Sequence, residues 1–531
     1  MGAGSGAGCA DDGAAGGYPD GGGSFDGGVA NTDLGPPPEQ EVELSFEPPA
    51  VGATVLFATN TGAGRVAVVH ADDFRIETVA VGAQPLPAVA VPGQDVALSL
   101  NRGDSSVDLL RSGPGGVVTE VQSFPLAHAA NRVAFSPDGL FAVLYEAEEP
   151  GQLRTNLQDI TVMTLTPGDE RLLRVVVGYG PSRITFDQSG GTLFVVTEDG
   201  VSVVDLGMLP AERTYRAPLV SFRSFEPVID TQITPDGTSA VTRVAGVSDV
   251  RLLSLLDGTV SIADLDDVIP VSTDPDAPPP EPALVTDMDL SPSGDEVFVV
   301  LRSHSLLVRI PVGPGFADSS TWRVHDLSTH MVGAVQLSSD GRWALLYSTT
   351  NGVEAITRLD LSDPLDDTGT RLPLRKGVRA VAFSSANTFA LVLHDRVPGD
   401  PNAGGLSSDQ RIDRQHGYSV IDLATGFTRL ELTAAEPRAD GFVIDDAGGR
   451  MLVALRNDAS GVRAMQIMDL ETFAVDELPL LAPPTTLGTF PGLERAFVGQ
   501  EADGGRVTFY LWPTEQTQTV AGFELGAGVR R

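Results

Sequence analysis

Histidine is the scarcest side chain with acid–base or metal-binding chemistry in this sequence, with 7 copies among 531 residues. His325 and His330 are five positions apart, which differs from the spacing of the helical His-Glu-x-x-His zinc motif. His394-Asp395 directly follows an apolar segment, so we expect this pair where a strand meets a loop. His394 is therefore the one histidine that we single out as a candidate for metal binding or general acid–base catalysis.

Aspartate is abundant, but its repeated copies lie within predicted turns. Asp138, Asp236 and Asp340 each stand in a copy of one phrase, Ser/Thr-Pro-Asp-Gly or a worn version of it. In such a phrase proline presets φ, aspartate accepts hydrogen bonds from free amides, and glycine takes positive φ. We therefore interpret these aspartates as turn formers. No motif identifies a catalytic residue, a cofactor-binding residue or a set of ligands for a divalent cation.

The single cysteine, Cys9, excludes an intramolecular disulfide and a cysteine-rich metal site. It follows Gly6-Ala7-Gly8, which resembles the end of a bacterial lipoprotein signal, where small residues precede a lipidated cysteine. Gly6 departs from the leucine that is usual there, and the eight residues before Cys9 contain no apolar core. Two alternatives stay open: the true start lies upstream and Cys9 is lipidated, or Cys9 is incidental.

Residues 1–42 differ in composition from the rest of the chain. They are rich in glycine, aspartate and proline and lack apolar periodicity, so they cannot bury enough surface to offset chain entropy. We expect a disordered, acidic tether. With Cys9 in this tether, we expect an extracytoplasmic protein, either a bacterial outer-membrane or cell-surface lipoprotein or a secreted one.

The net charge of −36 arises from 71 acidic and 35 basic residues, and lysine occurs once, at Lys376. Nucleic-acid binding depends on clustered basic side chains that neutralise phosphates, so nucleic acid is excluded as a partner. The excess carboxylates fit a protein that is kept in solution by its charge, and they favour cationic or basic ligands. No apolar run approaches the roughly 20 residues of a membrane span.

The turn phrase recurs from about residue 43 onward, at intervals of roughly 45 to 60 residues. Each copy ends one apolar strand and begins a second, and the third strand of a unit often ends in Asp-Leu. A fixed period of this length predicts an all-β protein, a β-propeller of four-stranded repeats. A polar fourth strand is expected at segments such as 171–177.

The number of repeats is nine or ten. First strands are expected near these positions: Pro87, Arg132, Arg183, Asp230, Asp287, Ala334, Ala380, Gly441 and Thr485. Further strand patterns at 54–58 and 65–69 precede them. A proline-rich stretch divides the repeats near 271–284, so residues 43–531 form either one large ring or two smaller propellers.

The repeat resembles those of YVTN-type and lactonase-like propellers, which are WD40-like in their blade plan and in which a strand ending in Ser-Pro-Asp-Gly precedes an apolar strand. Proteins with this repeat serve as binding surfaces and as enzymes. Our first hypothesis is an envelope-tethered scaffold that binds a protein or small-molecule ligand. The alternative that the resemblance implies is a lactonase-like hydrolase with a divalent metal in the central channel. We expect specificity to lie in the irregular insertions near 145–160, 266–284 and 395–417.

Overall fold

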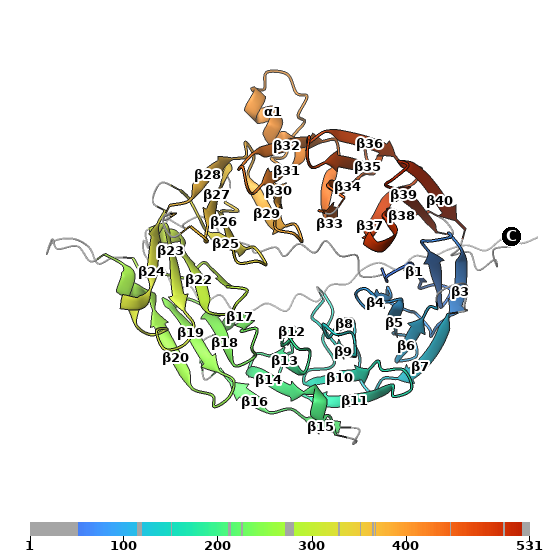
Figure 1. The fold of residues 1–531 in the computed structure, drawn as a ribbon, viewed down its shortest axis with the longest axis horizontal. Coiled ribbons are helices and arrows are strands. Elements are labelled where there is room, and N and C mark those ends of the chain that lie inside the picture. Colours follow the sequence, from blue (N-terminus) through green and yellow to red (C-terminus); the bar gives the residue numbers. More distant parts are fainter. Residues whose placement is uncertain are drawn as a thin grey trace, which may run out of the picture. The chain divides into compact units, whose positions relative to one another are not determined.

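Ten β-sheets form a ring in the computed structural model (Figure 1). The structure describes residues 51–522 except 114–118, 150, 211–213, 223, 225–226, 271–280, 328–329, 351, 364–365, 367, 447 and 503–504. Residues 38–531 make up one compact unit. The prediction of an all-β propeller is confirmed, with ten blades.

The first five blades follow one another along the chain. The first contains β1 (Val55–Asn60), β2 (Arg65–His70) and β3 (Ile76–Ala80), with an isolated bridge between Val51 and Leu56. The next four blades are β4 (Val89–Ala90), β5 (Val96–Asn101), β6 (Ser106–Arg111), β7 (Glu120–Pro125); β8 (Arg132–Phe135), β9 (Phe141–Tyr145), β10 (Asp159–Thr164), β11 (Arg171–Val176); β12 (Arg183–Phe186), β13 (Thr192–Val196), β14 (Gly200–Asp205), β16 (Leu219–Ser221); and β17 (Val228–Ile233), β18 (Ser239–Val244), β19 (Asp249–Ser254), β20 (Val260–Asp264).

The other five blades complete the ring. They are β21 (Asp287–Leu290), β22 (Glu296–Leu301), β23 (Leu306–Pro311), β24 (Arg323–Asp326); β25 (Ala334–Leu337), β26 (Trp343–Tyr347), β27 (Ala355–Asp360), β28 (Thr370–Pro373); β29 (Val378–Phe383), β30 (Phe389–His394), β31 (His416–Asp422), β32 (Thr428–Thr433); β33 (Glu436–Asp445), β34 (Arg450–Asn457), β35 (Val462–Asp469), β36 (Val475–Pro479); and β37 (Pro484–Phe490), β38 (Arg495–Gln500), β39 (Arg506–Leu511), β40 (Gln516–Ala521).

The predicted first strands overlap the inner strands of nine blades, and the predicted outer strand at 171–177 is β11. The blade formed by β1 to β3 is the tenth. One strand crosses between blades: β15 (Thr214–Arg216) pairs in parallel with β11 before the chain returns to its own blade as β16.

Helical structure is sparse in the described residues. One α-helix, α1 (Ser408–Arg414), lies in the insertion between β30 and β31, and its start is fixed by a capping box formed by Ser407 and Gln410. The remaining helical turns are of the 3₁₀ type: η2 (Leu206–Met208), η3 (Leu265–Val268), η4 (Arg302–His304), η5 (Ser319–Thr321) and η6 (Pro491–Leu493).

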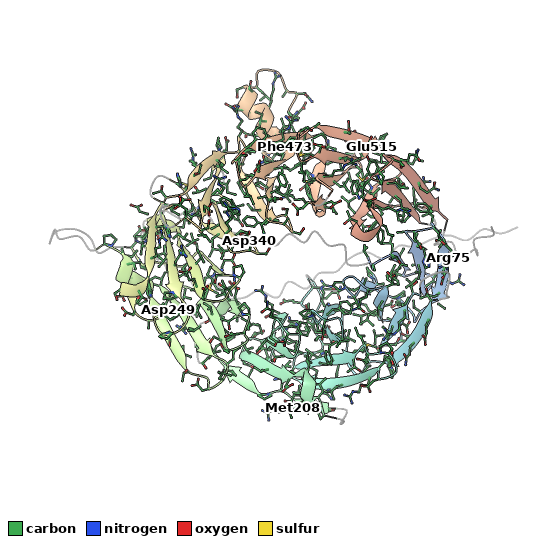
Figure 2. All side chains as sticks on the ribbon, viewed as in Figure 1. Arg75, Met208, Asp249, Asp340, Phe473 and Glu515 are labelled. Carbon is green, nitrogen blue, oxygen red and sulfur yellow. The ribbon has the colours of Figure 1, made fainter. Side chains whose placement is uncertain are left out.

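The core lies between neighbouring blades, and β22 shows why consecutive residues of a strand are apolar. Val297 and Val299 pack with the blade before, whereas Phe298 and Val300 pack with the blade after. Successive side chains of a strand point to opposite faces, so a strand between two blades must be apolar on both. Side chains fill the space between the sheets, with Asp340 towards the inside of the ring and Met208 at its outer edge (Figure 2).

The alternative of two smaller propellers is wrong. Val241 of β18 and Val299 of β22 belong to one hydrophobic cluster, so the blades on either side of 271–284 pack directly against each other. Residues 271–280 themselves lie outside the described residues.

The ring closes by side-chain packing between its first and last blades. Phe74, which follows β2, contacts Phe509 of β39 with ring centroids 5.2 Å apart. Leu56, Val69, Phe490 and Phe509 belong to one buried cluster. In the described residues the two blades share no strand, because β1 to β3 and β37 to β40 form separate sheets.

Candidate functional site

The two faces of the ring carry different connections between strands. Consecutive strands pair antiparallel, so the first-to-second connections lie on one face and the second-to-third connections on the other. The repeated turn phrases lie on the first of these, which we call the turn face. The insertions near 145–160 and 395–417 join second to third strands and lie on the opposite face, the insertion face.

The turn phrases form the structure predicted for them. Asp236 accepts hydrogen bonds from Thr234 Oγ1 at 2.6 Å and from the Thr238 amide at 3.0 Å. These bonds, that of Thr234 foremost, lower the pKa of the Asp236 carboxyl. Gly294 has φ +76° and lies against the preceding blade's turn, where a Cβ would stand 2.5 Å from Pro235 Cδ. Gly294 is therefore needed both for the turn and for its close approach to the adjacent turn.

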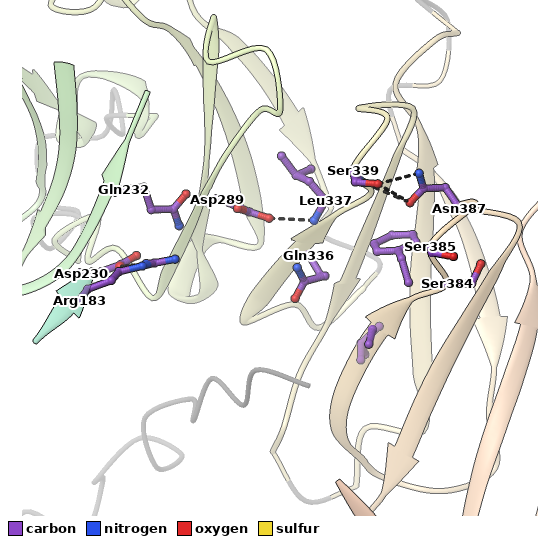
Figure 3. Close-up of a pocket in the computed structure, with 13 residues that line it drawn as sticks. Arg183, Asp230, Gln232, Asp289, Gln336, Leu337, Ser339, Ser384, Ser385 and Asn387 are labelled. Carbon is purple, nitrogen blue, oxygen red and sulfur yellow. Dashed lines mark hydrogen bonds and ion pairs between the residues drawn. The ribbon is translucent and has the colours of Figure 1, made fainter. Parts of the chain in front are cut away.

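A pocket of about 430 Å³ lies among the inner strands of five consecutive blades. We call it the inner pocket (Figure 3). It is lined mostly by polar side chains and by the turns of two blades: Arg183, Asp230, Gln232, Asp289, Gln336, Leu337, Ser339, Val381, Ala382, Phe383, Ser384, Ser385 and Asn387. The inner strands supply these groups at the edge of each sheet, where polar side chains reach the main chain of the next blade's inner strand.

Side chains along the pocket hold successive inner strands together. Gln232 of β17 accepts from the Leu290 amide at 2.8 Å and donates to the Met288 carbonyl at 3.1 Å. Asp289 of β21 in turn accepts from the Leu337 amide of β25 at 2.8 Å (Figure 3). Hydrogen bonds to a carboxylate are stronger than neutral ones, so these links fix the spacing of the pocket walls.

Two lining groups keep bonding capacity for a ligand. The Oδ2 atom of Asp230 is buried without a hydrogen-bond partner in the described structure, and its Oδ1 atom lies 3.9 Å from Arg183 Nη1. Buried carboxylate oxygens without partners are uncommon in folded proteins. The Gln336 side chain, labelled in Figure 3, has no hydrogen-bond partner among the described side chains and main-chain groups.

The pocket residues of the seventh and eighth blades occur where the repeat departs from its pattern. Ser339 and Ser385 occupy the proline position of the phrase, and Asn387, with φ +55°, occupies the glycine position. The Ser339 amide donates to Asn387 Oδ1 at 3.2 Å, and Asn387 Nδ2 donates to Ser339 Oγ at 2.9 Å. The copy with Asp340 was identified from the sequence as a worn version of the phrase, whereas the copy with Asn387 was not identified. The replacement of the proline and glycine of the phrase by serine and asparagine was the sequence signal that could have identified these pocket residues.

The candidate pair His394-Asp395 lies at the end of β30, as predicted, but it is enclosed. His394 Nδ1 donates to the Gly377 carbonyl at 3.0 Å, and its Nε2 accepts from Ser419 Oγ at 2.7 Å. Burial lowers the pKa of the His394 imidazole to about 4. Both ring nitrogens form hydrogen bonds within the protein, so we interpret His394 as a structural residue and not as a metal ligand or acid–base group.

The only lysine of the chain lies next to this histidine. Lys376 is fully buried, and its ammonium donates to the carbonyls of Ile412 at 2.8 Å and Asp413 at 3.2 Å, at the end of α1. Burial lowers the pKa of the Lys376 ammonium, an effect opposed by the carboxylates of Asp413 and Asp395. Burial in turn raises the pKa of Asp395. These groups fasten the insertion to the eighth blade.

The metal-dependent alternative was tested against the side chains of the inner pocket. Among the described residues, no group of three or more His, Cys, Asp or Glu side chains is placed to hold a metal ion. Asp230 and Asp289 are the pocket's only carboxylates, and Asp289 is bonded to a main-chain amide. The pocket does not fit a divalent metal, which needs several oxygen ligands converging on one point.

The predicted lipidation site Cys9 and the predicted tether at 1–42 lie outside the described residues. No helix in the described part of the chain has the length and apolar character needed to cross a membrane.

No family model matches the chain, and no curated protein matches it. Solved structures with a similar arrangement include hydrazine synthase of Kuenenia stuttgartiensis, with 14% identity over 71% of this chain and 99% of that one and a TM-score of 0.36. AztD from Citrobacter koseri shows 12% identity over 72% and 94%, with a TM-score of 0.39. The Swd1 β-propeller domain of Myceliophteria thermophila shows 13% over 72% and 96%, with a TM-score of 0.36. Likenesses this remote carry no argument about function, and the YVTN-type or lactonase-like character stays a prediction.

Proposed function

We propose that this protein is a non-enzymatic binding scaffold and that its ligand enters the inner pocket with a cationic group. The unpartnered carboxylate oxygen of Asp230 carries this proposal. Leaving a buried acceptor unsatisfied costs about 1–3 kcal/mol, so such a group is best explained by a partner that arrives from outside. An ammonium or guanidinium ion supplies the missing donor and balances the charge.

The surrounding residues favour the same ligand class. The pocket contains two carboxylates, Asp230 and Asp289, against one guanidinium, Arg183. The chain as a whole carries a net charge of −36, which attracts cations towards the ring over a longer range. Gln336 adds a carbonyl oxygen and an amide group that can orient the bound ligand.

Binding of n-butylguanidinium, measured by calorimetry at physiological salt, tests the proposal. We expect Asp230→Asn to weaken binding by roughly tenfold, the loss of one charge-assisted hydrogen bond. Glu477→Gln is the matched control, because it removes one charge from the exposed outer strand β36. An equal loss in both variants would show that the probe follows net charge and not the pocket.

We further propose that the scaffold is extracytoplasmic and tethered to a bacterial envelope through Cys9. The small residues before Cys9 and the glycine- and aspartate-rich composition after it support this proposal. Mass spectrometry of the protein extracted from its native membranes tests it, with an acylated cysteine expected at the mature terminus. An intact Met1 in the soluble fraction would contradict the tether.

A further inference from the structure

A second pocket, of about 390 Å³, lies on the insertion face between the sixth and seventh blades, and we call it the rim pocket. It is lined by Ser305, His330, Met331, Gly352, Val353, Ala355, Thr357 and Arg371. Connecting segments supply most of this lining, while Ala355 and Thr357 come from β27 and Arg371 from β28. None of these residues lines the inner pocket.

Arg371 is the charged group of the rim pocket, and no acidic side chain lines it. Arg371 is exposed, and its guanidinium pairs with no carboxylate of the described residues. Thr357 lies directly opposite Arg371 in the ladder between β27 and β28, so both side chains project from the same side of the sheet. An arginine that pairs with no carboxylate in the described part of so acidic a chain is available to an anion from outside.

His330 stands beside this arginine in a fixed orientation. Its Nδ1 atom hydrogen-bonds Thr357 Oγ1 at 2.8 Å, which leaves Nε2 for a ligand. Burial, together with the nearby Arg371 charge, lowers the pKa of the His330 imidazole. Thr357 itself is buried, so the imidazole is anchored by a side chain that cannot swing away.

Apart from Ser305 and Gly352, the other lining residues have apolar side chains. Met331 is 61% exposed and lines the pocket together with Val353 and Ala355, and we call these three side chains the apolar wall. A methionine left open in a pocket adapts its shape to apolar ligands. The pocket volume of about 390 Å³ is larger than an inorganic ion fills, so the geometry favours an anion that carries an apolar group.

We propose that the rim pocket binds a small organic carboxylate, with the carboxylate on Arg371 and His330 and an apolar chain against Met331 and Val353. Arginine and carboxylate match as a two-pronged pair, which distinguishes this ligand from a neutral molecule of the same shape. The site is independent of the cation-binding inner pocket.

Sodium hexanoate is the probe for this site, and hexylammonium is its matched control with the same chain and opposite charge. With the full-length protein labelled at its methionine methyl groups, protein-detected NMR should show that hexanoate shifts the Met331 methyl signal and that hexylammonium does not. We expect Arg371→Met to weaken hexanoate binding by roughly tenfold or more. Arg371→Lys should weaken it less, because lysine keeps the positive charge but cannot make two parallel hydrogen bonds to the carboxylate.

Arg411→Met is the control variant, since Arg411 lies in α1 and outside the rim pocket. It should bind hexanoate as the unmodified protein does. The proposal is overturned if Arg371→Met binds hexanoate with unchanged affinity, if Arg411→Met loses as much, or if inorganic phosphate displaces hexanoate at equal concentration, because the apolar wall would then contribute nothing.

Discussion

Arg495 of the last blade lies over the ring of Phe74 in the first blade, with its guanidinium carbon 4.9 Å from the ring centroid. Its Nη1 atom also donates to the main-chain carbonyl of Asp72 at 3.0 Å. Beneath this contact, Phe74 packs on the buried Phe509. The closure of the ring thus has a polar contact at its surface and an aromatic core below it.

The aromatic core should contribute most of the stability of this closure. We expect Phe509→Ala to lower the free energy of unfolding by about 3–5 kcal/mol, since it leaves a cavity in a buried cluster. Arg495→Ala should lower it by only about 1 kcal/mol, because a cation–π contact between half-buried side chains near the surface is weak. Urea denaturation followed by tryptophan fluorescence measures both. Equal losses would mean that the surface contact holds the ring closed.

His394 should make stability depend on pH. The unfolded chain, with a histidine pKa of 6.5, takes up a proton as the pH falls below that value, whereas folded His394 does so only near its pKa of about 4. Stability is therefore lost as the pH falls from 6.5 to 4. Between pH 7.5 and pH 5 the native protein should lose about 2 kcal/mol more than His394→Gln, which does not titrate. Identical pH profiles in urea denaturation would contradict this.

Lys376 should resist amine-reactive reagents in the native protein. It is the only lysine of the chain and it is fully buried, so a reagent should label the amino terminus alone until urea exposes the second amine. Peptide mass spectrometry distinguishes the two sites. Rapid native labelling of Lys376 would show that the insertion carrying α1 opens freely.

Weakening α1 should increase that labelling. Ser407→Ala removes the side chain that accepts from the Gln410 amide and costs about 1 kcal/mol, so labelling of Lys376 should rise about fivefold. Ser460→Ala, in the turn between β34 and β35 on the same face, is the control and should leave the labelling rate unchanged.

Asn387 should tolerate glycine better than alanine. Both replacements remove the hydrogen bonds to Ser339, but alanine must also adopt a φ of +55°. We expect Asn387→Ala to be less stable than Asn387→Gly by about 1 kcal/mol. Thermal unfolding of the two variants checks the order, and the reverse order would mean that the turn changes conformation.

The sequence was enough to predict the propeller because each repeat contains its own strands and turn. The first blade was harder to identify, since the turn after Val51 lacks the Pro-Asp-Gly phrase. The helix α1 was not predicted because seven residues are too few to show helical periodicity.

The pockets were beyond the reach of a single sequence. Asp230 and Asn387 line one pocket although 157 positions separate them, and only the curvature of the ring brings them together. No pattern in the sequence distinguishes Arg371, because a missing ion-pair partner depends on which residues are neighbours in three dimensions. His394 was chosen for its place after a strand, and its burial could not be read from that place.

Each blade from the fifth to the tenth takes all its strands from one uninterrupted stretch of chain, and its ladder hydrogen bonds stay inside that stretch. A gene segment encoding one such blade can therefore be duplicated or deleted without disturbing the hydrogen-bonded register of any other. The new neighbours need only compatible apolar faces and a turn that stacks. Duplication or deletion of this sequence unit can therefore give rings with different numbers of blades, of which the ring of ten is one.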